Sequence, residues 1–183
     1  MPASPHFTPH ALVLLLAVAV TIIATWLTLS LRETPEDPLG WPRRFLEALA
    51  GGLSSGGRER LYWSGILVYS GVVSALHFGG LHFDIYGIVA QWDTITHLTS
   101  GAGVAMLLYL TFHLGAPDRS LRWILPAVLA IGGGFEIYEF LLKDFWYGWT
   151  LRYYLLDTVA DLAINLVGSL FAVGGLAALR RGG

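Results

Sequence analysis

The sequence predicts an all-α protein, a polytopic membrane bundle of five transmembrane helices that forms a single integral membrane domain over residues 1–183. Hydrophobic residues make up 55% of the chain, charged residues make up only 13%, and the mean hydropathy is +0.60. Five separate stretches are apolar over nearly the length that a helix needs to cross about 30 Å of hydrocarbon. Composition and segment length together favour lipid over water as the solvent of this chain.

The predicted spans are residues 11–31, 61–78, 95–114, 123–142 and 155–179. No basic segment precedes the first span, it is longer than the apolar part of a secretory signal, and no clear cleavage site follows it. We therefore expect it to remain in the mature protein. Proline and glycine clusters predict a cytoplasmic loop at 32–60. Within that loop, "WPRRFLEALAGGL" would form either a short amphipathic helix on the inner membrane surface or part of a solvated connector.

The distribution of basic residues predicts the orientation, because Lys and Arg in short loops tend to stay in the cytoplasm. With the N-terminus outside and the C-terminus cytoplasmic, nine of the eleven basic residues lie inside. Tryptophans fall near both expected interfaces. We expect a multi-pass protein of a prokaryotic plasma membrane. The inner residues are Arg32, Arg43, Arg44, Arg58, Arg60, Arg119, Arg122, Arg180 and Arg181, against Lys143 and Arg152 outside; the tryptophans are Trp26, Trp41, Trp63 and Trp123 inside and Trp92, Trp146 and Trp149 outside.

Charge and cysteine content exclude some classes of function. The net charge of −2 argues against nucleic acid as a partner, since nucleic-acid binding favours a basic patch. The absence of cysteine excludes disulfides and thiolate metal sites. Membrane lipid is the partner that the composition predicts.

Ionisable side chains recur inside the predicted spans at helical spacing. In an up-and-down bundle, the start of the third span, the end of the fourth and the start of the fifth lie on one membrane side. The orientation above makes this the outer side, and the second loop reaches the same level. The residues are Asp93 and His97; Glu136 and Glu139; Asp157, Asp161 and Asn165; and, near the loop, His77, His82 and Asp84.

Structural explanations compete with functional ones at most of these positions. Asp93 and Asp157 would serve as helix caps, and Glu139 would pair with Lys143 on an exposed turn. His97 would be a satisfied packing residue, and Asn165 and Gly168 would hold helices together. Near the loop, His77 and His82 would be unremarkable polar residues. Glu136 and Asp161 are the hardest to explain in this way, because each lies about one turn deeper than a cap requires.

The energetic cost of the acidic residues points to a neutralising partner. Five uncompensated carboxylates at membrane depth would cost on the order of 10 kcal/mol, which is comparable to the whole stability of a domain. Two divalent ions would nearly balance the five charges, with His97 as a neutral ligand. Zinc, manganese, iron and magnesium all fit such donors. Protonation of the carboxylates is the alternative. The predicted metal ligands are Asp93, His97, Glu136, Asp157 and Asp161, supported by Asn165, His77, His82 and Gly168.

The C-terminal half resembles a known family through "DTITHLTSGAGVAMLL", "EIYEF" and "DTVADLAINLVGS". These segments, between Trp92 and Leu170, are similar to the YjdF-like family of small membrane proteins and more distantly to VanZ-like proteins. The resemblance marks Asp93, His97, Glu136, Glu139, Asp157, Asp161 and Gly168. VanZ-like proteins are associated with glycopeptide resistance, but the chain departs from their pattern around the fourth span and lacks their usual Arg between helices.

Three functions remain open from the sequence. The first is a metal-dependent hydrolase that acts at the outer leaflet on a lipid, a lipid-linked molecule or another envelope substrate, with Glu139 as the general base. The second is a proton or cation transporter that uses the same polar row, for which five helices would require a homodimer. The third is a noncatalytic scaffold whose polar residues only hold the helices together.

Overall fold

The computed structural model describes residues 7–32, 34–113, 121–143 and 148–182, and in these ranges every regular element is helical. Five of the helices are long and apolar enough to cross a membrane, which confirms the predicted fold class. The elements are α1 (Phe7–Ser30), the 3-10 helix η1 (Pro38–Gly40), α2 (Trp41–Ser54), α3 (Gly57–His82), α4 (Ile85–Ile88), α5 (Trp92–His113), α6 (Ile124–Leu142) and α7 (Leu151–Gly182).

Most of the membrane helices extend beyond the apolar stretches that predicted them. Helix α3 begins at Gly57 rather than at residue 61, and α7 begins at Leu151 rather than at residue 155. The added turns carry charged residues such as Arg58 and Arg152, so a search for apolar stretches leaves them out although their backbone is helical. Parts of the orientation prediction concern Arg119 and Trp146, which lie outside the described residues, as do the side chains of Arg180 and Arg181.

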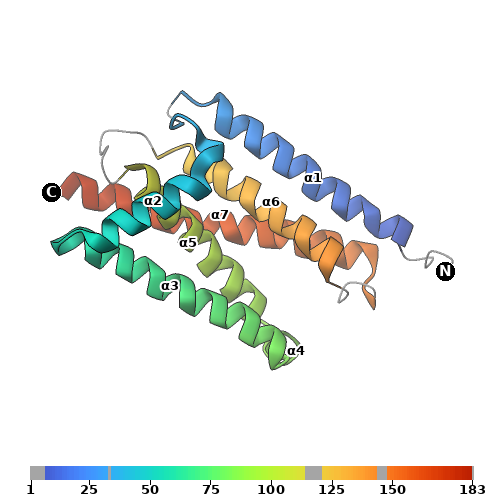
Figure 1. Ribbon diagram of the computed structural model, residues 1–183. Coiled ribbons are helices and arrows are strands. Elements are labelled where there is room, and N and C mark those ends of the chain that lie inside the picture. The colour runs from blue at the N-terminus through green and yellow to red at the C-terminus, as the bar shows by residue number, and fades with distance from the viewer. Residues whose placement is uncertain (1–6, 33, 114–120, 144–147, 183) are drawn as a thin grey trace.

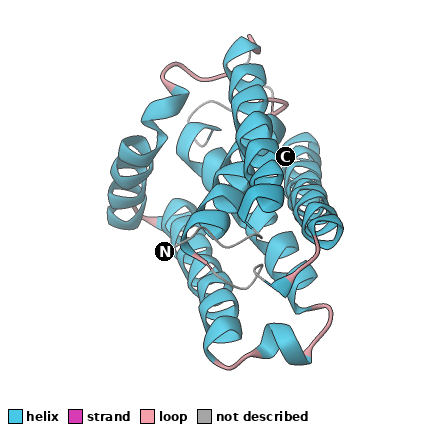
Figure 2. Ribbon diagram, turned by 90° about the vertical axis from the view of Figure 1, so that its right-hand side faces the viewer, coloured by secondary structure: helices cyan, strands magenta, loops and turns pink. Residues whose placement is uncertain are grey.

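The long helices run alternately up and down the bundle (Figure 1). The most extensive contacts join α5 to α7 and α1 to α6, while α6 also packs on α7 and α3 packs on α5. Figure 2 shows the same bundle turned by 90°, with α4 in the connection between α3 and α5. This connectivity brings the end of α3, the start of α5, the end of α6 and the start of α7 to one end of the molecule, which we call the polar end.

The predicted short helix within residues 32–60 forms as α2 and packs across α3 and α5. Its contact with α3 depends on Gly52, because a Cβ there would lie 1.8 Å from Cδ1 of Trp63. The Trp63 side chain is completely buried, and its ring lies 5.9 Å from that of Phe45. Residues 41–54 are therefore a packed helix at the end opposite the polar end, which we call the aromatic end.

Apolar side chains fill the core of the aromatic end. Phe112 and Trp123 pack edge to face with their ring centroids 5.4 Å apart, and Ile124 beside them is fully buried. The guanidinium of Arg44 on α2 lies 5.7 Å from the Phe112 ring, a distance at which cation–π attraction operates. This end of the bundle is thus held by aromatic and aliphatic contacts.

Helices α5 and α7 approach so closely that only glycine fits at two points of their crossing. A Cβ on Gly101 would lie 2.1 Å from the carbonyl oxygen of Asn165, and one on Gly168 would lie 2.0 Å from that of Leu98. Small residues at such crossings allow backbones to approach in lipid. This close crossing brings the polar residues of α5 within reach of those of α7.

Candidate metal site at the polar end

Three of the predicted ligands meet where α5 crosses α7. Within the described ranges, ligand atoms of Asp93, His97 and Asp161 all lie within 4.8 Å of one another. Nε2 of His97 lies 3.4 Å from Oδ1 of Asp93 and 3.7 Å from Oδ2 of Asp161. The side chains of His97 and Asp161 are buried and that of Asp93 is half-buried. The i, i+4 spacing on α5 and the glycine-mediated crossing together create this group.

Two of the distances between these donors match what a tetrahedral ion requires. Zinc binds imidazole nitrogen and carboxylate oxygen at about 2.1 Å, so two such ligands on a tetrahedral ion lie about 3.4 Å apart. The separations of 3.4 and 3.7 Å from the His97 nitrogen agree with that value within a few tenths of an ångström. One imidazole and two carboxylates are also a donor set that zinc, iron and manganese accept.

Asn165, one turn further along α7, sets the orientation of the His97 ring. Its Nδ2 lies 3.2 Å from Nδ1 of His97, and both side chains are buried. With the amide nitrogen as donor, Nδ1 accepts, and the ring proton is on Nε2, facing the two carboxylates. A half-turn of the amide would let Nδ1 donate to the Asn165 oxygen and leave Nε2 free to bind a metal. Asn165 thus supports either neutral tautomer of the ring.

The remaining predicted carboxylates lie outside this three-residue group. Glu136 is 3% exposed, and its Oε2 accepts a hydrogen bond of 3.1 Å from Oγ1 of Thr158. Its other oxygen, Oε1, is buried and has no hydrogen-bond partner among the described residues. Glu139 and Asp157 are half-buried. Of the five expected ligands, the structure therefore brings three together, and Glu136 and Asp157 lie outside the group.

The supporting residues occupy three different environments. Gly168 lies at the close crossing of α5 and α7, where it holds the two helices at ligand distance. His77 is half-buried on α3, whereas His82 is exposed at the end of that helix. Asp84 follows with a left-handed backbone (φ 53°) and leads into α4. Of His77, His82 and Asp84, only His77 lines the pocket between α3, α5 and α6.

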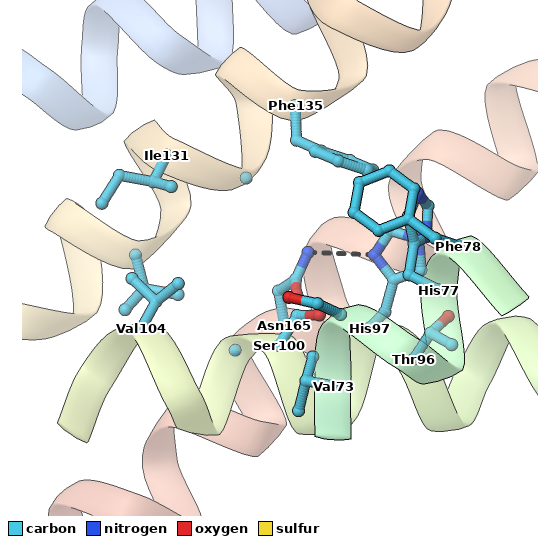
Figure 3. A pocket seen from close by; sticks show the side chains of 14 residues that line it. Val73, His77, Phe78, Thr96, His97, Ser100, Val104, Ile131, Phe135 and Asn165 are labelled. Carbon is cyan, nitrogen blue, oxygen red and sulfur yellow. Dashed lines mark hydrogen bonds between the residues drawn. The ribbon is translucent and has the colours of Figure 1, made fainter. Parts of the chain in front are cut away.

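A pocket of about 230 Å³ adjoins the metal group between α3, α5 and α6. Figure 3 shows His77, His97 and Phe135 gathered at one end of it, with Val104 and Ile131 at the other. The Phe135 ring packs edge to face with both imidazoles, with centroid distances of 5.5 Å to His77 and 6.1 Å to His97. The pocket thus has an apolar end and an end that is lined by the imidazole of His97.

Two side chains of this region were not predicted from the sequence. Thr158 is completely buried and holds Glu136, and Tyr86 on α4 contacts His77 through its hydroxyl group. Thr158 had a signal, because it shares one face of α7 with Asp161 and Asn165 at i, i+3 and i+7 spacing. Tyr86 lies in a connection with no periodic pattern, so its position followed only from the folded chain.

The fold and the site define the class of this protein: a multi-pass α-helical membrane protein with a buried group of histidine and carboxylate side chains at one end. The chain belongs to the family described as "Predicted membrane protein (DUF2238)", whose sequence profile matches residues 5–182. No curated protein and no solved structure matched the chain.

Proposed function

We propose that this protein is a divalent-metal-dependent hydrolase that acts on a lipid or lipid-linked substrate at the outer face of a prokaryotic plasma membrane. The observation that carries the proposal is the group of three donors, Asp93, His97 and Asp161, whose ligand atoms all lie within 4.8 Å of one another. Catalytic zinc sites use three protein ligands and leave the fourth position to water or substrate. The neighbouring pocket provides space for an apolar substrate beside that position.

Charge supports a divalent ion over a monovalent one. The two carboxylates of Asp93 and Asp161 carry two negative charges, and the imidazole of His97 is neutral when it binds a metal. A divalent ion would make the three-ligand site neutral overall. Neutrality favours binding within the membrane, where an uncompensated charge near the bilayer centre costs about 3 kcal/mol or more.

The hydrolytic step needs a base that is not a ligand. A divalent ion of this type lowers the pKa of water and polarises a carbonyl or phosphoryl oxygen. The structure favours Glu136 as the base, because Thr158 fixes one carboxylate oxygen and leaves the other without a partner among the described residues. Glu136 would take a proton from water as the water oxygen bonds to the carbon or phosphorus atom of the ester. It would return that proton to the leaving oxygen as the bond between this atom and the leaving oxygen breaks. Glu139, the base predicted from the sequence, lies one turn further along α6.

The test is hydrolysis of lipid esters by protein reconstituted in phosphatidylcholine vesicles, before and after chelation and zinc addition. We expect turnover to disappear on chelation and return with zinc. Glu136→Gln should retain the metal and lose at least about 100-fold in turnover, while Glu139→Gln retains most of it. Metal-independent proton flux abolished by Asp161→Asn would instead identify a transporter. If the protein shows neither turnover nor proton flux, the polar residues have a packing role only.

A further inference from the structure

The pocket beside the metal group has an apolar body and an opening on the surface of the bundle. Val73, Val104 and Ile131 line the body, and Phe78, whose side chain is 61% exposed, lies at the edge. All the lining residues belong to candidate membrane spans, so the molecules that meet this opening are lipids. An apolar cavity of about 150 Å³ already admits benzene. The volume of about 230 Å³ therefore suits part of one hydrocarbon chain.

A chain of hydrogen bonds links the His77 imidazole to Tyr86 and Thr96. Oγ1 of Thr96 donates to the carbonyl oxygen of Asp93 at 2.8 Å, so towards Tyr86 it acts only as an acceptor. The Tyr86 hydroxyl donates to Thr96 at 3.4 Å, and its oxygen lies 2.9 Å from Nδ1 of His77. With the hydroxyl proton of Tyr86 directed at Thr96, Nδ1 of His77 donates to the Tyr86 oxygen. The neutral ring then carries a bare lone pair on Nε2.

Tyr86 remains a donor at neutral pH, because burial raises its pKa to about 12. Gly80 makes this arrangement possible: a Cβ there would lie 2.7 Å from Cε2 of Tyr86. The position of the tyrosine is thus determined by the close packing of α4 on α3.

Nε2 of His77 is buried and has no hydrogen-bond partner among the described residues. A buried acceptor that lacks a donor is costly, so a ligand that supplies the donor gains binding free energy. The Phe78 ring lies against the imidazole, 5.1 Å between centroids. The Phe78 side chain is largely exposed, so its ring has space to turn outward.

We propose that the pocket binds a single-chain membrane lipid that bears a free hydroxyl group, with the hydrocarbon chain between α3 and α6 and the hydroxyl donating to Nε2 of His77. Phe78 acts as the cover that turns aside for entry. If the bound lipid is also the substrate, this inference rests on the proposed hydrolase. The substrate class is then single-chain lipid esters that bear a hydroxyl group beside the ester group.

The experiment compares a photoreactive long-chain alcohol with its O-methyl ether, which has the same chain but no donor. The protein is reconstituted in phosphatidylcholine vesicles, and the labelled positions are mapped by mass spectrometry. We expect the alcohol to label α3 and α6 around the pocket about fivefold more than the ether, the ratio that one hydrogen bond provides. Equal labelling by the two probes in the unmodified protein would overturn the proposal.

Variants of the pocket sharpen the test. Val73→Trp should fill the pocket and abolish the labelling, whereas Val72→Trp, on an exposed neighbouring position, should not. His77→Phe should equalise alcohol and ether. Tyr86→Phe keeps the imidazole but removes the hydroxyl partner of its Nδ1, so it should lower the preference without abolishing labelling. Size-exclusion profiles identify variants that fail to fold, and unchanged labelling in Val73→Trp would place the probe elsewhere and refute the pocket.

The same measurement with and without metal separates this inference from the proposed function. The preference for the alcohol should persist after chelation, because His77 is not a member of the metal group. Persistence of the preference in a protein that binds no metal would refute the hydrolase and leave the lipid pocket standing. A protein that binds metal at Asp93, His97 and Asp161 but shows no preference would refute the pocket alone.

Discussion

The two ends of the bundle are packed in different ways. At the aromatic end, Trp63 and Trp123 are almost completely buried among apolar side chains and the covering helix α2. At the polar end, the buried residues include His97, Glu136 and Asp161, and a pocket lies beside them. The difference suggests that stability resides mainly in the first end, and that the second end keeps costly polar groups because they bind something.

The largest effect on stability is expected from Trp63→Ala. Truncation leaves a cavity under α2 and should lower the free energy of unfolding by about 4 kcal/mol. Trp26→Ala is the matched control, because that side chain is 64% exposed and should change little. Denaturant unfolding in detergent measures both. Metal content should stay unchanged in Trp63→Ala, and its loss would show that the two ends are not independent.

Gly168→Leu tests the crossing that supports the polar end. Because its Cβ would lie 2.0 Å from the carbonyl oxygen of Leu98, α5 and α7 must separate. We expect a loss of about 3 kcal/mol in stability together with loss of metal, since Asp161 moves away from His97. Gly174→Leu on the same helix meets nothing within 4 Å and serves as the control. Retention of metal in Gly168→Leu would contradict this account of the site.

A smaller effect of opposite sign is expected from Glu136→Gln in metal-free protein. The amide oxygen still accepts the hydrogen bond from Thr158, and the cost of a buried charge is removed. Stability should rise by about 1 kcal/mol. Glu139→Gln should give a smaller rise, because that side chain is only half-buried. A clear decrease for Glu136→Gln would mean that its carboxylate stabilises the fold.

The smallest effect is expected on the surface of α2. Arg43 and Glu47 form an i, i+4 pair with a 3.7 Å separation between Nε and Oε1, and their side chains are 74% and 67% exposed. Arg43→Ala should cost less than about 0.5 kcal/mol, and the cost should shrink further in high salt. Unfolding measured at two salt concentrations checks this. A larger cost would show that the Arg43–Glu47 pair stabilises α2 more than an exposed ion pair usually does.

The sequence predicted the helices and the end of the bundle at which the polar residues lie. It did not predict which carboxylates lie close together. Apolar length is sufficient to identify a span, and helix count places Asp93, Glu136 and Asp161 at one end. Which side chains converge depends on the rotation of each helix about its axis, and one residue of helix corresponds to 100°. The rotation of α6 directs Glu136 towards Thr158 on α7. Such rotations are set by packing contacts between helices. The residue pattern of one helix does not predict these contacts.

The pocket and the docking of α2 escaped prediction for a related reason. The pocket depends on the placement of α3 relative to α6, and its polar end depends on Tyr86 in a short connection. The docking of α2 depends on a glycine that accommodates Trp63. These are contacts between segments that lie far apart in the chain, and they cannot be predicted from a single sequence.

Metal content of the purified protein tests the central claim most directly. Elemental analysis should find one divalent ion per chain, lost in His97→Phe and Asp161→Asn but retained in Asp157→Asn, which lies outside the three-residue group. Retention of the metal in Asp161→Asn would contradict the proposed metal site. The same conclusion would follow if the unmodified protein bound no divalent ion when zinc, manganese and iron are supplied in turn.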